Sequence, residues 1–396
     1  MSLEHLALRQ QIAAMTAEAL SRAPAAADAL STALGLLRAH AADFDRLAAR
    51  VVAARWMPFR AAIPTEPLDA HHAARAAPRD YCIVSTDGSH VEPDRHGPAV
   101  CYLLNIGSAV IRYGSRPGAR LQSAPFLGYR REDLYLTAGG VEVPVQERVL
   151  ALRRHIEEMR ALTRLAVESS GDIPVIALAD GTLLVSAWGQ GDDSQVLEVL
   201  VGQFVECLEE LRRHDIAVAS YISRPRGSDV VNLLRLASCP FGEVECSSWC
   251  RGRSSSAVPC APLSTVTDRQ VFDALPLPAG ARSAVFESSW ATSQQRYEEN
   301  RVQFFYVDVG PEVARVEVPR WVAVDPARLE LVQAVVLDQV ARGQGYPRAL
   351  IEAHEKAVLA TSDRRVYEAM VEHALEEAGL SIGSSRKGLS KSVGQY

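Results

Sequence analysis

The sequence lacks the features that mark a membrane or secreted protein. No apolar run in its 396 residues approaches the length of a membrane span. The opening residues, Met-Ser-Leu-Glu-His, contain no basic segment followed by an apolar one, so no secretory signal is recognisable. We therefore expect a cytoplasmic protein with no membrane partner.

An excess of positive charge is also missing. The chain has 42 Lys and Arg against 48 Asp and Glu, which gives a formal net charge of −6. A protein that binds nucleic acid through its whole surface is excluded, and any such binding must use a local patch. The content of 48% hydrophobic and 23% charged residues is ordinary for a globular protein. The length suits one large domain or two moderate ones.

Paired Cys-x-x-Cys motifs are absent as well. Four of the seven cysteines nevertheless cluster, at Cys239, Cys246, Cys250 and Cys260. In a cytoplasmic protein a cluster indicates a metal before it indicates disulfides, but this spacing is not that of a zinc finger or ribbon. A structural metal and four free or buried thiols both stay open, and thiols are the commoner case.

One sequence pattern, an apolar run followed by Asp-Gly-Ser or Asp-Gly-Thr, occurs twice in the chain. The segments are Tyr81-Cys-Ile-Val-Ser-Thr-Asp87-Gly88-Ser89 and Pro174-Val-Ile-Ala-Leu-Ala-Asp180-Gly181-Thr182. Each apolar run is typical of a buried strand, and the Gly after it lets the chain turn, which leaves the Asp at the strand's exit. If the strands are neighbours, the two carboxylates converge, at a cost that a hard divalent cation would offset. The pair indicates a metal site, with two ordinary Asp-Gly turns as the alternative.

The order of the predicted elements fits a known architecture. We predict strands at 81–87, 99–107 and 108–114 (with a bend at 105–107), helix 144–169, strand 174–179, helix 193–213, strand 216–222 and helix 228–237. The first three strands can form an antiparallel meander and the later ones parallel crossovers, so the fold class is α/β with a mixed sheet flanked by helices. This order is ribonuclease H-like. In that architecture metal carboxylates lie at the ends of the first and fourth strands, where Asp87 and Asp180 stand, and on the first helix.

Five motifs occur in a fixed order over residues 81–360. They are Thr86-Asp87-Gly88-Ser89; Ala179-Asp180-Gly181-Thr182; Tyr221-Ile-Ser223-Arg224-Pro225 with Leu233-Leu-Arg235; Arg315-Val-Glu317-Val-Pro319; and Gly345-Tyr346-Pro347 running into Glu352-Ala-His354-Glu355. Together they resemble the NurA family of DNA-end-processing nucleases. The resemblance implies a ribonuclease H-like core, manganese-dependent DNA cleavage of the 5′–3′ exonuclease and single-strand endonuclease type, a homodimer, and a HerA-type hexameric ATPase as partner.

The resemblance also implies site residues. Asp87 and Asp180 match the strand carboxylates, His354 matches the family histidine, and Tyr346 the aromatic residue before it. A Glu on helix 144–169 completes the acidic set, and this helix carries Glu157 and Glu158 side by side. Neighbouring helical residues point about 100° apart, so only one can face the metals. We favour Glu157, which the apolar positions leave nearer the edge of the buried face.

These residues also bear on the choice of ion. Mg²⁺ would serve geometrically, whereas Mn²⁺ accepts a His ligand more readily and is favoured if His354 binds it. For DNA backbone contacts we consider Arg224, Arg226 and Arg235, together with Lys387 in the basic tail, because guanidinium and ammonium groups pair with phosphate. The alternatives are solvated side chains and a flexible terminus.

We divide the chain on this basis. The segments are an N-terminal helical segment at 1–58 (two helices that separate near residues 22–24), a linker at 59–80, a NurA-like nuclease domain at 81–360, and a terminal helix with a basic tail at 361–396. The nuclease domain comprises the core 81–238, a β-rich insertion 239–320, and C-terminal helices 321–360. Two other functions stay open: an inactive DNA clamp that only assembles with a translocase, and a phosphotransferase with a related core. The second expects an adenosine motif, which is not evident.

Overall fold

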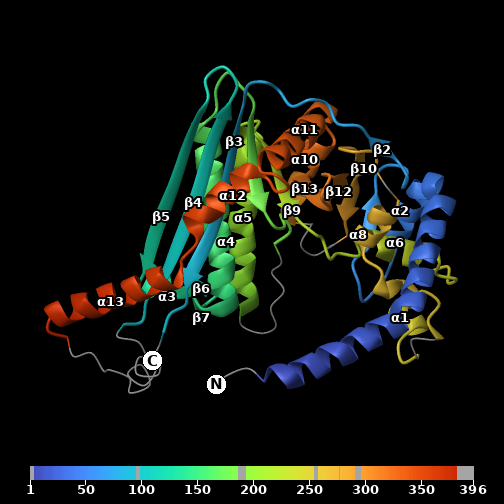
Figure 1. Ribbon diagram of the computed structural model, residues 1–396, viewed down its shortest axis with the longest axis horizontal. Helices are drawn as coiled ribbons and strands as arrows, with labels where there is room; N and C mark the ends of the chain where they lie inside the picture. The colour runs from blue at the N-terminus through green and yellow to red at the C-terminus, as the bar shows by residue number, and fades with distance from the viewer. Residues whose placement is uncertain are drawn as a thin grey trace. The chain divides into compact units, whose positions relative to one another are not determined.

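The computed structural model describes residues 4–94, 99–185, 193–253, 257–275, 277–289 and 296–380 (Figure 1). The chain forms two compact units. The N-terminal unit contains residues 1–74, 222–295 and 301–317, and the core unit contains residues 75–221, 296–300 and 318–396. Among the described residues, no helix combines the length and the apolar character needed to cross a bilayer.

The core unit is built on a five-stranded sheet. Its strands are β3 (Tyr81–Val91), β4 (Tyr102–Tyr113), β5 (Gly118–Gly128), β8 (Val175–Asp180) and β9 (Ala217–Ile222). Their spatial order is β9-β8-β3-β4-β5. The pairs β3–β4 and β4–β5 are antiparallel, and the pairs β3–β8 and β8–β9 are parallel. This is the ribonuclease H-like order, so the predicted fold class is confirmed.

Helices cover both faces of this sheet. Helix α4 (Glu147–Glu168) packs against β3, and α5 (Asp193–Arg213) packs against α4. Helix α12 (Arg348–Ala357) crosses β3 and β4, as Figure 1 shows. Asp87 pairs with Gly107 under α12, whereas Gly88 lies under α4. Because successive side chains of a strand point to opposite faces, α4 and α12 lie on opposite sides of the sheet.

The described part of the core unit contains seven further elements. They are α3 (Arg131–Leu134), β6 (Tyr135–Ala138), β7 (Val141–Pro144), the 3₁₀ turn η4 (Glu298–Asn300), α10 (Arg320–Ala323), α11 (Pro326–Arg342) and α13 (Thr361–Glu377). Strands β6 and β7 form a separate hairpin that the sequence analysis missed. Asp325 is the N-cap of helix α11, and its carboxylate accepts hydrogen bonds from the backbone N–H groups of Ala327 and Arg328.

The N-terminal unit has its own core. Its elements are α1 (His5–Ala39), η1 (Ala41–Asp43), α2 (Phe44–Val52), β1 (Ala62–Pro64), β2 (His71–His72), α6 (Asp229–Ala237), α7 (Cys246–Trp249), η3 (Pro262–Thr265), α8 (Asp268–Ala274), β10 (Arg282–Ser283), β11 (Phe286–Ser288), β12 (Val302–Asp308) and most of β13 (Val313–Pro319). Strands β1, β11, β12 and β13 are neighbours in that order. Apolar side chains of α1, α2, α6 and β12, including Leu37, Leu47, Leu234 and Phe304, form one buried cluster.

Three predicted element boundaries are wrong. Strand β3 does not end at Asp87 but continues through Gly88 to Val91, paired with β4 over its whole length. Strand β4 is continuous through residues 105–107, so the predicted second and third strands are one strand, and the third strand is β5. Helix α1 likewise continues through Pro24 instead of ending there, and the helices separate at residues 40–43. Proline removes one helical hydrogen bond, but the alanines around it are the strongest helix formers and offset part of that cost.

Candidate active site

Asp87 and Asp180 lie at the same edge of the sheet. Strands β3 and β8 are parallel neighbours, and Thr86 pairs with Ala179 one residue before the two aspartates. Gly181 follows Asp180 with φ at +80°, a conformation that glycine adopts without strain, so the chain leaves the sheet directly after the carboxylate. Asp87 lies inside β3, at the point where β3 extends past the end of β8, so the parallel register brings its carboxylate beside that of Asp180.

Helix α12 and the turn before it add two side chains to this pair. The Nδ1 atom of His354 donates to Oδ2 of Asp87 at 2.7 Å. The hydroxyl of Tyr346 donates to Oδ1 of Asp180 at 2.9 Å, and its ring meets Tyr221 edge-on at 5.3 Å between centroids. Each strand carboxylate thus holds one side chain from the C-terminal region of the chain.

The position of α12 depends on two residues of β4. A Cβ atom at Gly107 would come within 2.2 Å of the Ala353 carbonyl oxygen, so only glycine lets the helix lie this close to the strand. The buried amide of Asn105 donates to the carbonyl oxygens of Lys356 and Ala357 at 3.0 and 2.9 Å. These bonds satisfy the last turn of α12 and hold His354 beside Asp87.

The structure places Glu158, not Glu157, near the aspartates. The Oε1 atom of Glu158 fills the space beside Gly88, where an added Cβ would come within 2.4 Å of it. The backbone oxygen of Glu158 accepts the Thr86 hydroxyl at 2.9 Å, which fixes this turn of α4 against β3. Our preference for Glu157 is therefore not supported. The apolar residues of α4 showed which face of the helix is buried, but not which edge of that face lies beside Asp87 and Asp180.

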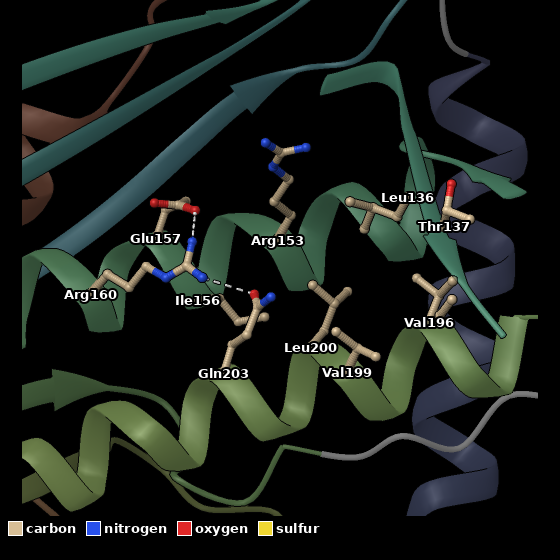
Figure 2. A pocket seen from close by; sticks show the side chains of 11 residues that line it. Leu136, Thr137, Arg153, Ile156, Glu157, Arg160, Val196, Val199, Leu200 and Gln203 are labelled. Atoms are coloured by element: carbon tan, nitrogen blue, oxygen red, sulfur yellow. Dashed lines mark hydrogen bonds and ion pairs between the residues drawn. The ribbon is translucent and has the colours of Figure 1, made fainter. Parts of the chain in front are cut away.

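Glu157 points to a different part of the core unit. Its carboxylate accepts from Nη1 of Arg160 at 2.7 Å, and Arg160 also donates to Gln203 on α5 at 3.0 Å (Figure 2). These three side chains line a cavity of about 230 Å³ between α4, α5 and β6, together with Leu136, Val196 and Leu200, among others. Glu157 belongs to this α4–α5 contact.

The carboxylates influence one another electrostatically. The pKa of Asp180 is raised, first because the protein packed around its carboxyl group disfavours the charged form, although the residue is exposed at the strand end. The negative charges of Asp87 and Glu158 raise it further, while the Tyr346 hydroxyl and the Gly181 N–H oppose the shift by donating to the carboxylate. Mutual repulsion of this kind is what a bound cation would relieve.

The donor set suits a hard divalent cation. Three carboxylates and one imidazole are ligands that Mn²⁺ accepts. The Oε1 atom of Glu158 is also buried without a hydrogen-bond partner, although Nε of Arg154 lies 3.1 Å away. In the described part of the chain, no group of three His, Cys, Asp or Glu side chains is spaced to hold an ion as it stands. Ion binding therefore requires these side chains to draw together.

Two neighbours of Glu158 escaped the sequence analysis. Arg154 lies one helical turn before it and also donates from Nη1 to the Gly88 carbonyl at 3.1 Å. His155 stacks on Phe204 at 5.2 Å between ring centroids, and its Nδ1 donates to Oε2 of Glu158 at 3.2 Å. The signal was available, because residues three and four apart on a helix lie on one face.

The basic side chains considered for DNA contact differ in their surroundings within the N-terminal unit. Arg224 and Arg226 are exposed, and Arg224 lies beside Glu312. Arg235 instead stacks over Phe59 at 4.0 Å and donates to Asn232 at 2.9 Å, so its guanidinium serves the packing of α6. Lys387 lies outside the described residues.

The cysteine cluster lies in the N-terminal unit without forming a disulfide. Burial raises the pKa of Cys246 to about 11, and the charges of the other three cysteines act in the same direction. Within the described ranges, no three of Cys239, Cys246, Cys250 and Cys260 are placed to hold a metal ion together.

The comparisons with known proteins decide the family. The model of the NurA domain matches residues 82–359, which is most of the chain. The chain belongs to the NurA family. A NurA domain indicates a nuclease role in DNA end processing.

Similarity of the chain to solved structures and to curated proteins is weaker. A solved structure titled "Crystal structure of LC9-RNase H1, a type 1 RNase H with the type 2 active-site motif" is similar at 16% sequence identity with a TM-score of 0.22. The similarity covers 37% of this chain and 64% of that one, and the ribonuclease H-like assignment depends on the strand order instead. No curated protein matches the chain.

Proposed function

We propose that this NurA protein is a divalent-metal-dependent deoxyribonuclease that processes DNA ends, with 5′–3′ exonuclease and single-strand endonuclease activity. The observation that carries the proposal is the meeting of Asp87 and Asp180 at one sheet edge, with Glu158 beside Gly88 and with His354 hydrogen-bonded to Asp87. End-labelled duplex and single-stranded DNA, incubated with the protein and Mn²⁺, test it. Products shortened from the 5′ end and internal cuts in single strands are expected. A protein that binds these DNAs without cutting them would be the inactive clamp instead.

Asp87, Asp180 and Glu158 would hold the ion, with His354 as a further ligand or neighbour. A divalent cation held there supplies the Lewis acidity that phosphodiester hydrolysis needs. Neighbouring side chains orient the carboxylates that would bind the cation. Tyr346 keeps the Asp180 carboxylate in one position through its hydroxyl, and His155 does the same for Glu158. The side chain of His354 is 66% exposed, so its other ring nitrogen can hold or give a proton at the leaving oxygen.

Replacing each of the two neighbouring glutamates with Gln tests which one binds the cation. We expect Glu158→Gln to slow single-turnover cleavage by about two to three orders of magnitude, because it removes one of three charges that hold the cation. Glu157→Gln is the matched control on the same helix, and its rate is expected to stay within about threefold of the parent. The measurement is cleavage of end-labelled DNA at saturating Mn²⁺. The reverse order of effects would return Glu157 to the site.

Replacing His354 with Ala tests its role in the chemical step. We expect about a ten- to hundredfold slower single-turnover rate with little loss of DNA affinity, because affinity depends on many phosphate contacts whereas one positioned imidazole acts in the transition state. DNA binding, cleavage and thermal unfolding are measured on one preparation. If His354 served only packing, the melting temperature would fall and the folded fraction would cut DNA at the normal rate.

We further propose a homodimer that works with a HerA-type hexameric ATPase. The first half of α1 supports a docking role, because its apolar residues Leu6, Met15 and Leu20 are between 64% and 69% exposed. Mass measurement in solution and co-purification from the native host test the two assemblies. We expect a dimer at micromolar concentration, and loss of the ATPase but not of the dimer when the three residues become Ser. A monomer with no ATPase attached would contradict both.

A further inference from the structure

The most informative cation in the core unit is the guanidinium of Arg154. It lies on α4 with its Nε atom 3.1 Å from Oε1 of Glu158, and its Nη1 donates to the Gly88 carbonyl at 3.1 Å. The Glu158 side chain is only 13% exposed, so solvent screens this pair less than an ion pair on the surface. Arg154 thus connects helix α4 to strand β3 beside Asp87.

The contact between the two side chains is incomplete. The Nε atom of Arg154 and Oε1 of Glu158 are both buried, and neither has a hydrogen-bond partner, so their closeness is not that of an aligned bond. The other carboxylate oxygen, Oε2, does have a partner in His155 at 3.2 Å. Glu158 is therefore held through Oε2, while Oε1 faces a positive charge to which it is not bonded.

Gly88 makes this arrangement possible. A Cβ atom at that position would come within 2.4 Å of Glu158 Oε1 and 3.0 Å of Arg154 Cγ. Both side chains occupy the space that a larger residue would take, and both therefore lie against the strand that carries Asp87. The sequence Asp87-Gly88 thus supplies a carboxylate and, next to it, room for a carboxylate and a guanidinium.

We propose that Arg154 is a positioning residue that shares Glu158 with the catalytic cation and sets how tightly that cation is held. The inference rests on the proposed metal-dependent function. The bond to the Gly88 carbonyl fixes the Arg154 guanidinium against β3, and its charge attracts Oε1 of Glu158 toward that strand while opposing a second positive charge at Oε1. The nuclease thereby keeps an aligned ligand and gives up part of its ion affinity.

Manganese binding in the absence of DNA tests the proposal directly. Titration of the full-length protein with Mn²⁺ by calorimetry is expected to show about tenfold tighter binding for Arg154→Gln, since a like charge near the ion is removed. At saturating Mn²⁺ the same variant is expected to cleave DNA about tenfold more slowly, because Glu158 loses its alignment. Opposite changes in affinity and rate are not what a merely structural role produces.

Two further variants complete the design. Arg160→Gln is the matched control, because Arg160 lies on the same helix but pairs with Glu157, and its Mn²⁺ affinity and rate should equal those of the parent. Arg154→Lys keeps the charge without the fork that reaches the Gly88 carbonyl, so its Mn²⁺ affinity should match the parent while its cleavage stays slow. If Arg154→Gln fails to fold, Arg154→Lys alone decides.

The outcomes separate this inference from the function beneath it. Mn²⁺ binding by Arg154→Gln that equals or falls below the parent's overturns the role of Arg154, as does normal cleavage by Arg154→Lys. A parent protein that binds no Mn²⁺ overturns the metal-dependent function itself, whatever the variants do.

Discussion

Asn in place of Asp87 or Asp180 is expected to abolish DNA cleavage and leave the fold intact. The amide keeps the size of the side chain but removes the charge that holds the cation, so we expect a loss of about three orders of magnitude or more in rate. The oxygen of Asn can still accept the Gly88 N–H at position 87, and the Tyr346 hydroxyl at position 180. Single-turnover cleavage and thermal unfolding measure the two properties separately.

A control variant distinguishes this effect from a general loss of negative charge. Asp215 precedes β9, and its side chain is 72% exposed beside Arg328. Asp215→Asn should therefore cut DNA at the parent rate. The melting temperatures of the position-87 and position-180 variants should equal or exceed the parent's, because neighbouring carboxylates no longer repel one another. An unchanged rate in a well-folded Asp87→Asn protein would remove the strand-end pair from the mechanism.

Removal of divalent metal is expected to stop cleavage entirely, and Mn²⁺ is expected to restore it. Every proposed ligand is a carboxylate or an imidazole, and without a cation none of them can neutralise charge on the phosphate. Ca²⁺ should bind in competition with Mn²⁺ but should not support cleavage, because its looser coordination positions the attacking water poorly. The test is cleavage in excess EDTA, then with each ion added back. Activity that survives excess EDTA would refute the mechanism.

The sequence was a good guide where local pattern and tertiary role agree. The runs before Asp87 and Asp180 are buried strands in the structure, and their parallel register places the two Asp-Gly motifs side by side. The shared motif ends β8 as predicted, whereas β3 continues through Gly88 to Val91. The ribonuclease H-like order followed from the alternation of strands and helices. Periodicity of 2 and 3.6 residues carries that information within each segment.

The sequence was a poor guide where the role of a residue depends on contacts with a distant part of the chain. Gly107 suggested a bend, but its purpose is to admit α12, whose Ala353 carbonyl would clash with a side chain there. Arg235 suggested phosphate contact, but Phe59 receives its guanidinium. For Glu157 and Glu158, the apolar face of α4 left both near an edge, and only the packing of Thr86 and Gly88 against the helix distinguishes them.

The central claim is that Asp87, Asp180 and Glu158 together hold a catalytic ion. Anomalous scattering from a crystal of the protein grown with Mn²⁺ tests it most directly, because the signal locates the ion independently of activity. We expect a peak within coordination distance of all three carboxylates. A crystal with Mn²⁺ bound only elsewhere, and none between Asp87 and Asp180, would contradict it.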